Sequence, residues 1–594
     1  MDIIRRIECL RREMACEGID IYIVPSADCH GSEYVGDYFK IRQYLTGFTG
    51  SAGTAVFTRD KAGLWTDGRY YIQAEEQLKG SGIHLYRMGE PDTDTIEEFL
   101  EKELPAGGVI GFDGKVTELA VGDKYKEIAE RKGGHVLADF DLADRFWKER
   151  PALPGEKVWS LDEKYAGESV PSKLERIRKK MISYGADVHL LSSLDDISWL
   201  FNIRGNDVAY CPVVLAFAII EKDGGRIFAD KEKFPVGILN MLQGNNITVS
   251  SYESVYAAAQ NLSGRRVLLD PERTNYHLYY SIPDTAEIIK AENPSILMKS
   301  IKNGTEADNI RTAHLKDGIA HTRFLYWLKK SIGKVPITEI SAARKLEEFR
   351  AEQENFLGPS FAPISAAGSH GAIVHYSATE DSDMELQEGT LYLSDTGGHY
   401  LEGSTDITRT VALGNVPEEQ KKHFTIVARG MLRLANAVFL YGSSGVTLDA
   451  LAREVFWKER LNFNHGTGHG VGYLLNIHEP PINFRWREGA QPSRIFEENM
   501  VITDEPGIYI EGSHGIRLEN ELLVRKDVKN EYGQFMRFEI LTFVPIDLDA
   551  LVPECMSEDE KHLLNTYHKN VYKKISPYLN EEEKAWLRYA TRPI

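Results

Sequence analysis

The sequence predicts a mixed α/β and α+β protein, in which two similar α/β domains precede a larger α+β domain. Three observations lead to this prediction. The chain has 594 residues, which is too long for one hydrophobic core. Its first half contains a divergent repeat, and its pattern changes at about residue 305. The predicted domains span residues 1–155, 172–303 and 304–594.

The repeat consists of two copies of one helix–strand pattern. The first copy has GID at 18–20, the strand-like IYIVPS and then LWTDGRYY at 64–71. The second copy has GID-like GAD at 185–187, the strand-like HLLSS and then RIFADKEKF at 226–234. Apolar residues at helical spacing precede both copies, so each is predicted to be an α/β domain that begins with an amphipathic helix. The proline-rich stretch 151–171 is the predicted linker.

The remaining chain changes from helices to strands and back to helices. Apolar spacing predicts helices over 306–331, 338–353, 417–441 and 447–460. Strand-like runs with glycine turns are AIVHYS, TLYLSDTGG and DITRTVAL, and 494–546 is again rich in strand-like residues. The tail 557–594 is predicted to be helical. This alternation indicates an α+β domain.

Composition and charge argue against several classes of partner. The formal net charge of −19 at pH 7 opposes binding to the phosphates of nucleic acids and to anionic membranes. Residues 1–17 are rich in charged side chains, so we expect no signal peptide, and no apolar run is long enough to span a membrane. The five cysteines are scattered without a CxxC pair, which favours a reducing cytoplasm.

Five potential metal ligands lie beside glycine turns in the last domain. Asp395 ends the run LYLSD and Asp406 opens DITRTVAL, so a hairpin would bring the two carboxylates together. His469 lies in HGTGHGVG, Glu505 in TDEPG and Glu519 in IRLEN. Four carboxylates and one imidazole form a hard, oxygen-rich set of ligands. That many negative charges can hold two divalent cations with a bridging water.

Each of these residues also has an ordinary explanation when it is taken alone. An aspartate before Thr-Gly-Gly is commonly a turn residue, and a glutamate on a late strand is commonly solvated or paired with an arginine such as Arg517. A zincin helix is excluded, because Ile482 stands where HExxH requires its second histidine. Order, spacing and flanking residues together favour a metal site.

A resemblance to a known family becomes visible in longer segments. These are YLTGFTGSAGTA with LWTDGRYY, LDDISWLFNIRGNDV, GAIVHY, YLSDTGG with STDITRT, HGTGHGVG with NIHE, TDEPGIY, GIRLEN and the C-terminal AWLRYATRPI. In them the chain resembles the long, three-domain form of Xaa-Pro aminopeptidase, which belongs to the pita-bread metallopeptidases. The resemblance covers nearly the whole chain. It implies two creatinase-like α/β domains before a pita-bread catalytic domain.

The resemblance also implies an activity and a ligand set. The family pattern places the metal ligands at Asp395, Asp406, His469, Glu505 and Glu519. It implies two Mn²⁺ or related divalent ions, with Zn²⁺ and Co²⁺ as alternatives. The implied reaction removes the N-terminal residue from peptides whose second residue is proline. The family also implies a homodimer.

Further residues match positions around the substrate in this family. His375, His465 and His478 match histidines that surround the substrate, where His375 would stabilise the oxyanion and His478 would contact the peptide. Glu505 would act as the base besides binding metal, and His469 would also lie against the substrate. His465 has an alternative role as a brace of the glycine loop.

Three residues complete the implied site. Arg69 in WTDGRYY matches an arginine that the N-terminal domain contributes to the substrate, although a surface salt bridge is the alternative. Tyr509 and Arg517 flank the ligands and would orient them or the substrate.

Two other functions remain as alternatives. Prolidases are dipeptidases with the same metal set, but prolidase-like chains usually have one N-terminal domain, and this chain has two predicted copies. Non-enzymatic pita-bread proteins, such as some histone chaperones, bind partners instead. They lack the ligand set and carry long acidic tails, whereas this chain has all five ligands and no such tail.

Overall fold

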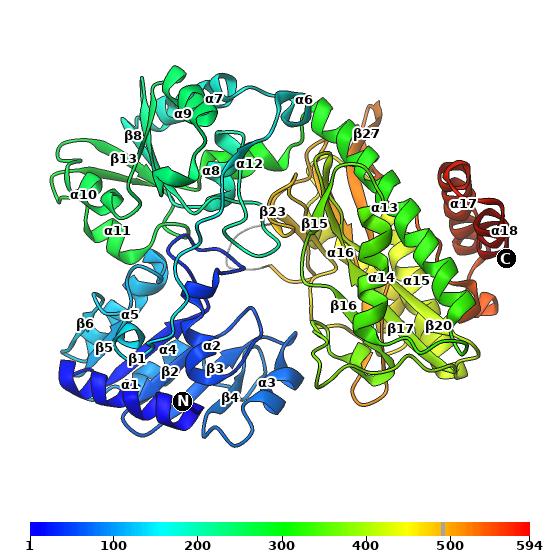
Figure 1. Ribbon diagram of the computed structural model, residues 1–594, viewed down its shortest axis with the longest axis horizontal. Helices are drawn as coiled ribbons and strands as arrows, with labels where there is room; N and C mark the ends of the chain where they lie inside the picture. The colour runs from blue at the N-terminus through cyan, green and yellow to red at the C-terminus, as the bar shows by residue number, and fades with distance from the viewer. Residues whose placement is uncertain (489–492) are drawn as a thin grey trace. The chain divides into compact units, whose positions relative to one another are not determined.

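The chain is divided into two compact units. The computed structural model describes residues 1–488 and 493–594 (Figure 1). The first unit comprises Met1–Asp162 and Glu168–Ile296, and the second comprises Glu163–Gly167 and Leu297–Ile594. The first unit therefore contains both copies of the repeat, and the second contains the predicted metal ligands. The predicted domain limits at 155, 172 and 303 stay predictions.

Two six-stranded sheets form the framework of the first unit (Figure 1, blue to green). The first sheet has the order β4 (His84–Arg87), β3 (Ala62–Thr66), β2 (Thr54–Thr58), β1 (Ile21–Pro25), β5 (Val109–Phe112) and β6 (His135–Leu137). The second has the order β12 (Ile247–Ser250), β11 (Gly225–Phe228), β10 (Phe217–Glu221), β8 (Val188–Leu191), β13 (Arg266–Leu269) and β14 (Glu287–Lys290).

The two sheets have the same topology. In the first sheet, the central strand β1 pairs antiparallel with β2 and parallel with β5. In the second sheet, β8 pairs antiparallel with β10 and parallel with β13 in the same way. The outer pairs also agree, since β3–β4 and β5–β6 are parallel, as are β11–β12 and β13–β14. The prediction of two similar α/β domains is confirmed.

Equivalent helices precede the two central strands. Helix α1 (Ile3–Glu17) buries Leu10 and Met14, and helix α7 (Val170–Tyr184) buries Leu174 and Ile177. Each helix ends at a glycine with positive φ, at Gly18 and Gly185. Such a φ costs little only for glycine, which explains why GID and GAD mark the repeat in the sequence.

The other helices of the first unit are shorter. They are α2 (Ile41–Thr46), α3 (Tyr71–Gln77), α4 (Ile96–Glu103), α5 (Leu119–Arg131), α8 (Leu194–Leu200), α9 (Val236–Gly244), α10 (Ser254–Gln260) and α11 (Tyr276–Tyr280). The predicted linker also has regular structure. It contains β7 (Trp159–Ser160), which pairs with β9 (Ile203–Arg204), and the short helix α6 (Glu163–Ala166) of the second unit.

The second unit combines helices with several small sheets. One sheet has the order β16 (Ile364–Ala367), β17 (Thr390–Thr396), β20 (Ile407–Leu413), and another the order β15 (Phe356–Pro359), β18 (Gly398–Tyr400), β19 (Gly403–Ser404). The largest has the order β21 (Val438–Leu440), β28 (Gly533–Ile540), β27 (Asn520–Asn530), β24 (Val501–Asp504), β22 (Gly468–Gly470), β23 (Glu479–Phe484). A hairpin of β25 (Gly507–Ile510) and β26 (His514–Arg517) completes the set.

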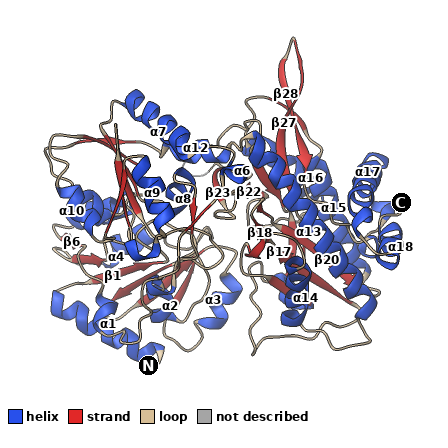
Figure 2. Ribbon diagram, turned by 45° about the horizontal axis from the view of Figure 1, so that its top comes forward, coloured by secondary structure: helices blue, strands red, loops and turns tan. Residues whose placement is uncertain are grey.

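Long helices pack beside these strands (Figure 2). They are α13 (Gly304–Ser331), α14 (Glu339–Ala351), α15 (Glu418–Ala435) and α16 (Gly445–Lys458), and the chain ends with α17 (Glu558–Ile575) and α18 (Glu581–Ala590). Helix α12 (Pro294–Ser300) spans the junction of the two units. No helix among the described residues has the length and apolarity needed to cross a bilayer.

Two local predictions in the second unit were wrong. The helix predicted over 417–441 ends at Ala435, and Val438–Leu440 forms strand β21, which pairs with β28. AIVHYS (372–377) is not a strand: its first residue ends the 3-10 turn η4 (Gly368–Ala372), and the rest is irregular chain. The partner of β17 is instead β16, so the β-branched residues of AIVHYS have no ladder to join.

Candidate metal centre

Two of the predicted ligands come from neighbouring antiparallel strands. Asp395 lies near the end of β17, and Asp406 lies directly before β20. The register pairs Asp395 with Thr408, two residues beyond Asp406. Both carboxylates are buried, with 7% and 4% of their residues' surfaces exposed. Buried carboxylates are costly unless a positive charge or donors compensate them.

His469 is carried by the glycine-rich loop. It lies in β22 between Gly468 and Gly470. A Cβ atom at Gly468 would lie 1.9 Å from the Thr503 carbonyl oxygen, and one at Gly470 would lie 2.2 Å from the Glu479 carbonyl oxygen. These glycines are therefore required for the close approach of the backbones that positions the imidazole.

Helix α16 holds this loop in place. Asp449 and Arg453 form a buried ion pair of 2.7 Å on one face of the helix. Arg453 donates a hydrogen bond of 2.8 Å to the His465 carbonyl, and Thr467 donates one of 2.6 Å to Asp449. The Thr467 carbonyl in turn accepts from the backbone N–H of Glu505 at 2.8 Å. The loop and the Glu505 turn are thus fixed by one network.

The last two ligands lie at the ends of strands. Glu505 follows β24 directly, and Glu519 lies between β26 and β27. Thr408 donates a hydrogen bond of 2.7 Å to Glu519, and Thr503 donates one of 3.2 Å to Glu505. Each threonine hydroxyl thus occupies one carboxylate oxygen, and in Glu519 the other oxygen, Oε1, has no hydrogen-bond partner.

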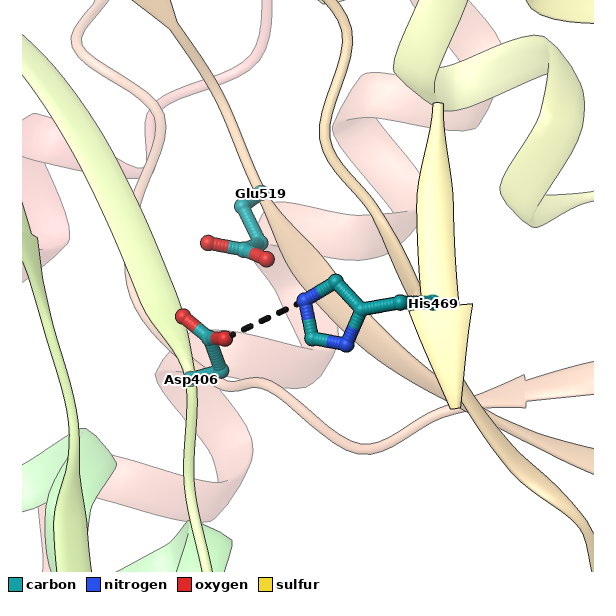
Figure 3. A group of neighbouring side chains, drawn as sticks. All are labelled: Asp406, His469 and Glu519. Atoms are coloured by element: carbon teal, nitrogen blue, oxygen red, sulfur yellow. Dashed lines mark ion pairs between the residues drawn. The ribbon is translucent and has the colours of Figure 1, made fainter. Parts of the chain in front are cut away.

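Three side chains from separate segments point toward one another (Figure 3). One ligand atom from each of Asp406, His469 and Glu519 lies within 4.8 Å of the other two. These distances are short enough for the three side chains to hold one metal ion. The His469 Nε2 atom is 3.5 Å from Asp406 Oδ2 and 3.4 Å from Glu505 Oε1. Glu505 therefore adjoins the same group through the imidazole.

Asp395 is turned toward a different partner. Its Oδ2 atom pairs with the buried guanidinium of Arg517. Its charge still acts on Glu505 and Glu519, and that of Asp406 acts on Asp395. All four carboxylates are thus close enough to repel one another, although Asp395 is not part of the group of three.

Burial and repulsion by neighbouring carboxylates shift the pKa values of three of these acids. Burial is the largest cause of the raised pKa of Asp395 and Glu505, and the neighbouring carboxylates add to it. The pKa of Glu519 is raised well above its usual value for the same two reasons. Burial lowers the pKa of His469, but a hydrogen bond with Asp406 and the charges of Glu505 and Asp406 outweigh it and raise the pKa to about 9.

Two oxygen atoms show that the donor set fits a cation. Asp395 Oδ1 and Glu519 Oε1 are buried and have no hydrogen-bond partner. Leaving a buried carboxylate oxygen without a donor is costly, and a divalent cation would satisfy both atoms. Carboxylate oxygens with one imidazole suit hard or borderline ions such as Mn²⁺ or Zn²⁺.

A chain of hydrogen bonds connects three other predicted residues to this centre. The His465 Nε2 atom lies 2.8 Å from the Tyr509 hydroxyl, and the Tyr509 hydroxyl accepts from Arg517 Nη1 at 2.8 Å. Arg517 also donates to Asp395. Burial raises the pKa of Tyr509 to about 12, so its hydroxyl keeps its proton at neutral pH. Arg517 therefore contacts both Asp395 and Tyr509, and His465 lies at the far end of this series of hydrogen bonds.

The remaining predicted residues are His478, His375 and Arg69, and each has its own set of neighbours. The His478 ring is perpendicular to that of His469, with 4.2 Å between the ring centroids. His375 follows Val374, whose carbonyl accepts from Arg517 Nη2 at 3.4 Å. Arg69 belongs to the first unit, where it makes two hydrogen bonds of 2.8 Å to the Asp67 carboxylate in the turn between β3 and α3.

The residues that support the ligands were not predicted from the sequence. Thr408 could have been found, because it lies two residues after Asp406 and therefore points to the same face of the strand. The buried ion pair of Asp317 and Arg350 was not foreseen, although a buried aspartate within an apolar helix is unusual. Nothing in the sequence indicates that His314 and Glu521 pair, since the chain between them is long.

Comparison with known families covers almost the whole chain. Metallopeptidase family M24 matches residues 308–526, and its C-terminal region matches 534–594. Two creatinase/prolidase N-terminal domains match 6–142 and 149–306. Aminopeptidase P2 of Arabidopsis thaliana is 36% identical over 97% of this chain and 86% of its own length. The chain belongs to the Xaa-Pro aminopeptidase P family.

Other members of the aminopeptidase P family agree in length and structure. A probable Xaa-Pro aminopeptidase P of Paracoccidioides brasiliensis (strain Pb18) is 35% identical, and the alignment covers all of both chains. The X-prolyl aminopeptidase of Caenorhabditis elegans, described as a cytosolic enzyme with a di-nuclear active site, has a TM-score of 0.95 at 34% identity over all of both chains. The Xaa-Pro dipeptidase of Bacillus anthracis covers only 64% of this chain, with a TM-score of 0.52 at 25% identity.

These findings confirm the predicted fold and class of enzyme. The chain is a metallopeptidase of the aminopeptidase P family, with two creatinase-type domains before a pita-bread domain. The family and the donor set together support two divalent metal ions. Shared length favours the aminopeptidases over the shorter dipeptidase, in agreement with the duplicated N-terminal domain.

The raised pKa of His469 predicts that metal binding releases protons. Without a metal, an imidazole with a pKa of about 9 is protonated at pH 7, whereas a metal ligand must be neutral. Mn²⁺ affinity should therefore rise with pH between about 6 and 9. The carboxylates with raised pKa values act in the same direction, because they too must lose protons. Calorimetric titration of chelator-treated protein with Mn²⁺, in two buffers of different ionisation enthalpy, measures the proton release.

A matched control is His562→Gln, which removes an exposed histidine of α17 and should leave the proton release unchanged. Equal binding heats in the two buffers would show that the cluster is already deprotonated and would contradict the prediction.

Proposed function

We propose that the chain removes the N-terminal residue from peptides whose second residue is proline. One observation carries the proposal. Asp406, His469 and Glu519 form a group that could hold a metal ion, and Glu505 adjoins His469, in a chain that matches Xaa-Pro aminopeptidases P over its full length. The C. elegans relative is described as having a di-nuclear active site, which agrees with this ligand set.

We assign the metal ligands to Asp395, Asp406, His469, Glu505 and Glu519. Bound divalent ions would activate a water molecule and polarise the scissile carbonyl group. Mn²⁺ is the proposed ion, because four of the five ligands are carboxylates, and Zn²⁺ and Co²⁺ are the alternatives. The unpaired oxygens of Asp395 and Glu519 support the participation of both residues.

Glu505 is the proposed general base. Thr503 donates a hydrogen bond to it, and its raised pKa brings it closer to the range in which a carboxylate accepts a proton efficiently. Arg517 and Tyr509 are positioning residues, because they hold Asp395 and do not need to touch the peptide.

The histidines have proposed roles on the substrate side. His375 would donate to the developing oxyanion, since its backbone neighbour Val374 is held by Arg517. His478 lies edge-on against His469 and would contact the peptide beside the metal ligand. His465, which contacts Tyr509, would keep that hydroxyl oriented. His469 would contact the substrate as well as the metal.

The proposal extends to the surroundings of the enzyme. The substrates would be peptides with a penultimate proline, and we propose no nucleic-acid or membrane partner. A cytoplasmic location is supported by the cytosolic description of the C. elegans relative. A homodimer is proposed from the family resemblance, and sedimentation velocity of the purified protein measures it, with a mass of one chain as the contrary result.

A substrate panel separates the aminopeptidase from the prolidase alternative. We expect Xaa-Pro-Yaa tripeptides to be cleaved after the first residue, with kcat/KM well above that of the matching Xaa-Pro dipeptides. The reason is that an aminopeptidase site accommodates chain beyond the proline, whereas a dipeptidase requires the free carboxylate there. Chromatography of the products measures both rates. A tripeptide with alanine in place of proline is the control, and cleavage of dipeptides alone would contradict the proposal.

Two substitutions distinguish the base from the oxyanion donor. Glu505→Gln keeps the size of the side chain but removes its charge, so kcat should fall at least about 10²-fold. His375→Ala should lower kcat by about 10²–10³-fold and change KM less, because a transition-state donor is lost. Steady-state kinetics at saturating Mn²⁺, with metal content measured in parallel, gives both values. Unchanged turnover in Glu505→Gln at full metal content would reduce Glu505 to a ligand, and a change in KM alone would place His375 in ground-state binding.

Arg69 is proposed to bind the substrate from the creatinase-type domain. Its guanidinium is already oriented by Asp67, and such a planar fork suits a peptide carbonyl or carboxylate. Arg69→Ala should lower kcat/KM for tripeptides by one or two powers of ten, about 1.4–2.8 kcal/mol, without loss of metal. The matched control is Arg59→Ala, which breaks the comparable ion pair of Arg59 with Asp20. Equal kcat/KM in the two variants would leave Arg69 as a structural partner of Asp67.

A further inference from the structure

Two histidines outside the metal centre lie in direct contact with each other. His423 of α15 and His514 of β26 face each other with 3.0 Å between His423 Nδ1 and His514 Nε2. Their rings are nearly parallel, at 26°, with centroids 5.2 Å apart. Neither residue belongs to the ligand set of the centre described above, and neither matches a motif of the sequence analysis.

The separation of the two nitrogens is close to that in a tetrahedral site. Two nitrogens bound to one Zn²⁺ at about 2.0–2.1 Å lie about 3.3 Å apart when the ligands are tetrahedral. The pair would therefore need to open by only a few tenths of an ångström. A hydrogen bond between the two rings accounts for the same distance without a metal, so the orientation of each ring has to be considered.

His514 is oriented as a ligand. Only 1% of its surface is exposed, and its Nδ1 atom lies 2.8 Å from the Ser513 hydroxyl. When Nδ1–H donates to Ser513, the lone pair of Nε2 points toward His423. Histidine ligands commonly have their second nitrogen held by an oxygen in this way. The rigid position of the ring reduces the entropy that binding would cost.

The two elements that carry the histidines are fixed by the core. Phe424 and Val427 of α15 belong to the same buried cluster as Ile508 of β25 and Ile516 of β26. His423 directly precedes Phe424, and His514 lies two residues before Ile516 in the strand. The distance between the imidazoles is therefore set by packing and does not depend on a flexible loop.

A carboxylate is within reach as a third ligand. Glu419 lies four residues before His423 on α15, so the two side chains share one face of the helix. Its charge acts on both imidazoles. Glu419 is exposed, so its carboxylate would turn toward the two histidines on binding, and a water molecule would complete four-coordination. Burial lowers the pKa of both histidines, so both are neutral at neutral pH, as metal ligands must be.

We propose that His423 and His514, with Glu419, bind one Zn²⁺ or a similar borderline transition-metal ion per chain. Imidazole favours Zn²⁺, Cu²⁺ and Ni²⁺, whereas the carboxylate-rich centre favours harder ions such as Mn²⁺. The bound ion joins α15 to β26. The same strand ends at Arg517, which holds Asp395, so the ion also braces the strand that orients one ligand of the metal centre.

Zinc content of the full-length protein tests the proposal. Wild type, His423→Gln and His562→Gln are equilibrated with one Zn²⁺ buffer, freed of unbound ions and analysed for zinc per chain. Zn²⁺ also enters the carboxylate-rich centre, so the difference between the proteins is the measurement. We expect His423→Gln to hold one zinc ion fewer than wild type. The matched control His562→Gln, which removes an exposed histidine, should equal wild type.

A second measurement identifies the ligands of the ion. Co²⁺ replaces Zn²⁺ and gives visible absorption bands whose intensity reports four-coordination. We expect these bands to be weaker in His423→Gln and in Glu419→Gln than in wild type. His514 is almost fully buried, so His514→Gln risks misfolding, and the half-buried His423 carries the test. Circular dichroism confirms that each variant is folded. Equal zinc content and equal cobalt spectra in wild type and His423→Gln would overturn the proposal, whatever the outcome for peptide cleavage.

Discussion

The second unit depends on the repulsion among four neighbouring carboxylates, three of them buried, and on the groups that oppose this repulsion. Burial raises the pKa values of Asp395, Glu505 and Glu519, and the charges of neighbouring carboxylates raise them further. The protein supplies only a partial counter-charge, in Arg517 and in a His469 that is held protonated. Two oxygens are left without any donor. Such an arrangement is unfavourable by itself and becomes favourable when cations are bound, so folding and metal binding are coupled.

A second layer of charges keeps the backbone of the ligands from moving apart. Arg350 and Asp317 form a buried ion pair, in which Arg350 donates to the Thr396 carbonyl at 3.1 Å and Asp317 accepts from Thr405. These backbone positions adjoin Asp395 and Asp406. Glu521 accepts from the backbone N–H of Asp406 at 2.7 Å and pairs with His314. Charged residues of helices α13 and α14 therefore hold the chain next to Asp395 and Asp406 in place. This role explains why they occur on otherwise apolar faces of these helices. Removing one partner of such a buried pair would leave an uncompensated charge.

The sequence predicted the parts of the site whose signal is local. The repeat was visible because glycine caps and apolar spacing recur in both copies, and the five ligand candidates were visible because turns and short motifs surround them. Residues that act over long separations were not. Arg409 donates to the Tyr567 hydroxyl of α17 at 2.7 Å and also to the Glu519 carbonyl, yet its place in DITRTVAL shows nothing of either contact.

AIVHYS was wrongly predicted to be a strand because β-propensity describes one segment, whereas a strand requires a neighbouring strand. The helix predicted to reach residue 441 stopped at Ala435 for the related reason that β28 offers a ladder to Val438–Leu440.

Histidines of the second unit have pKa values that their surroundings shift in opposite directions. His469 lies among carboxylates, and their charges outweigh burial and raise its pKa to about 9. In His423 and His514 burial is the dominant cause and lowers the pKa, and in His514 the neighbouring imidazole adds to the effect. A cation entering the carboxylate cluster must therefore displace a proton from its imidazole, whereas one entering the histidine pair meets two neutral rings. The carboxylate cluster selects among ions by their charge, since a divalent cation best compensates four acidic groups. The histidine pair selects among divalent ions by ligand type, since imidazole binds Zn²⁺ more favourably than Mn²⁺. Two metal preferences can thus coexist in one domain, because neighbours rather than residue identity determine how each histidine behaves.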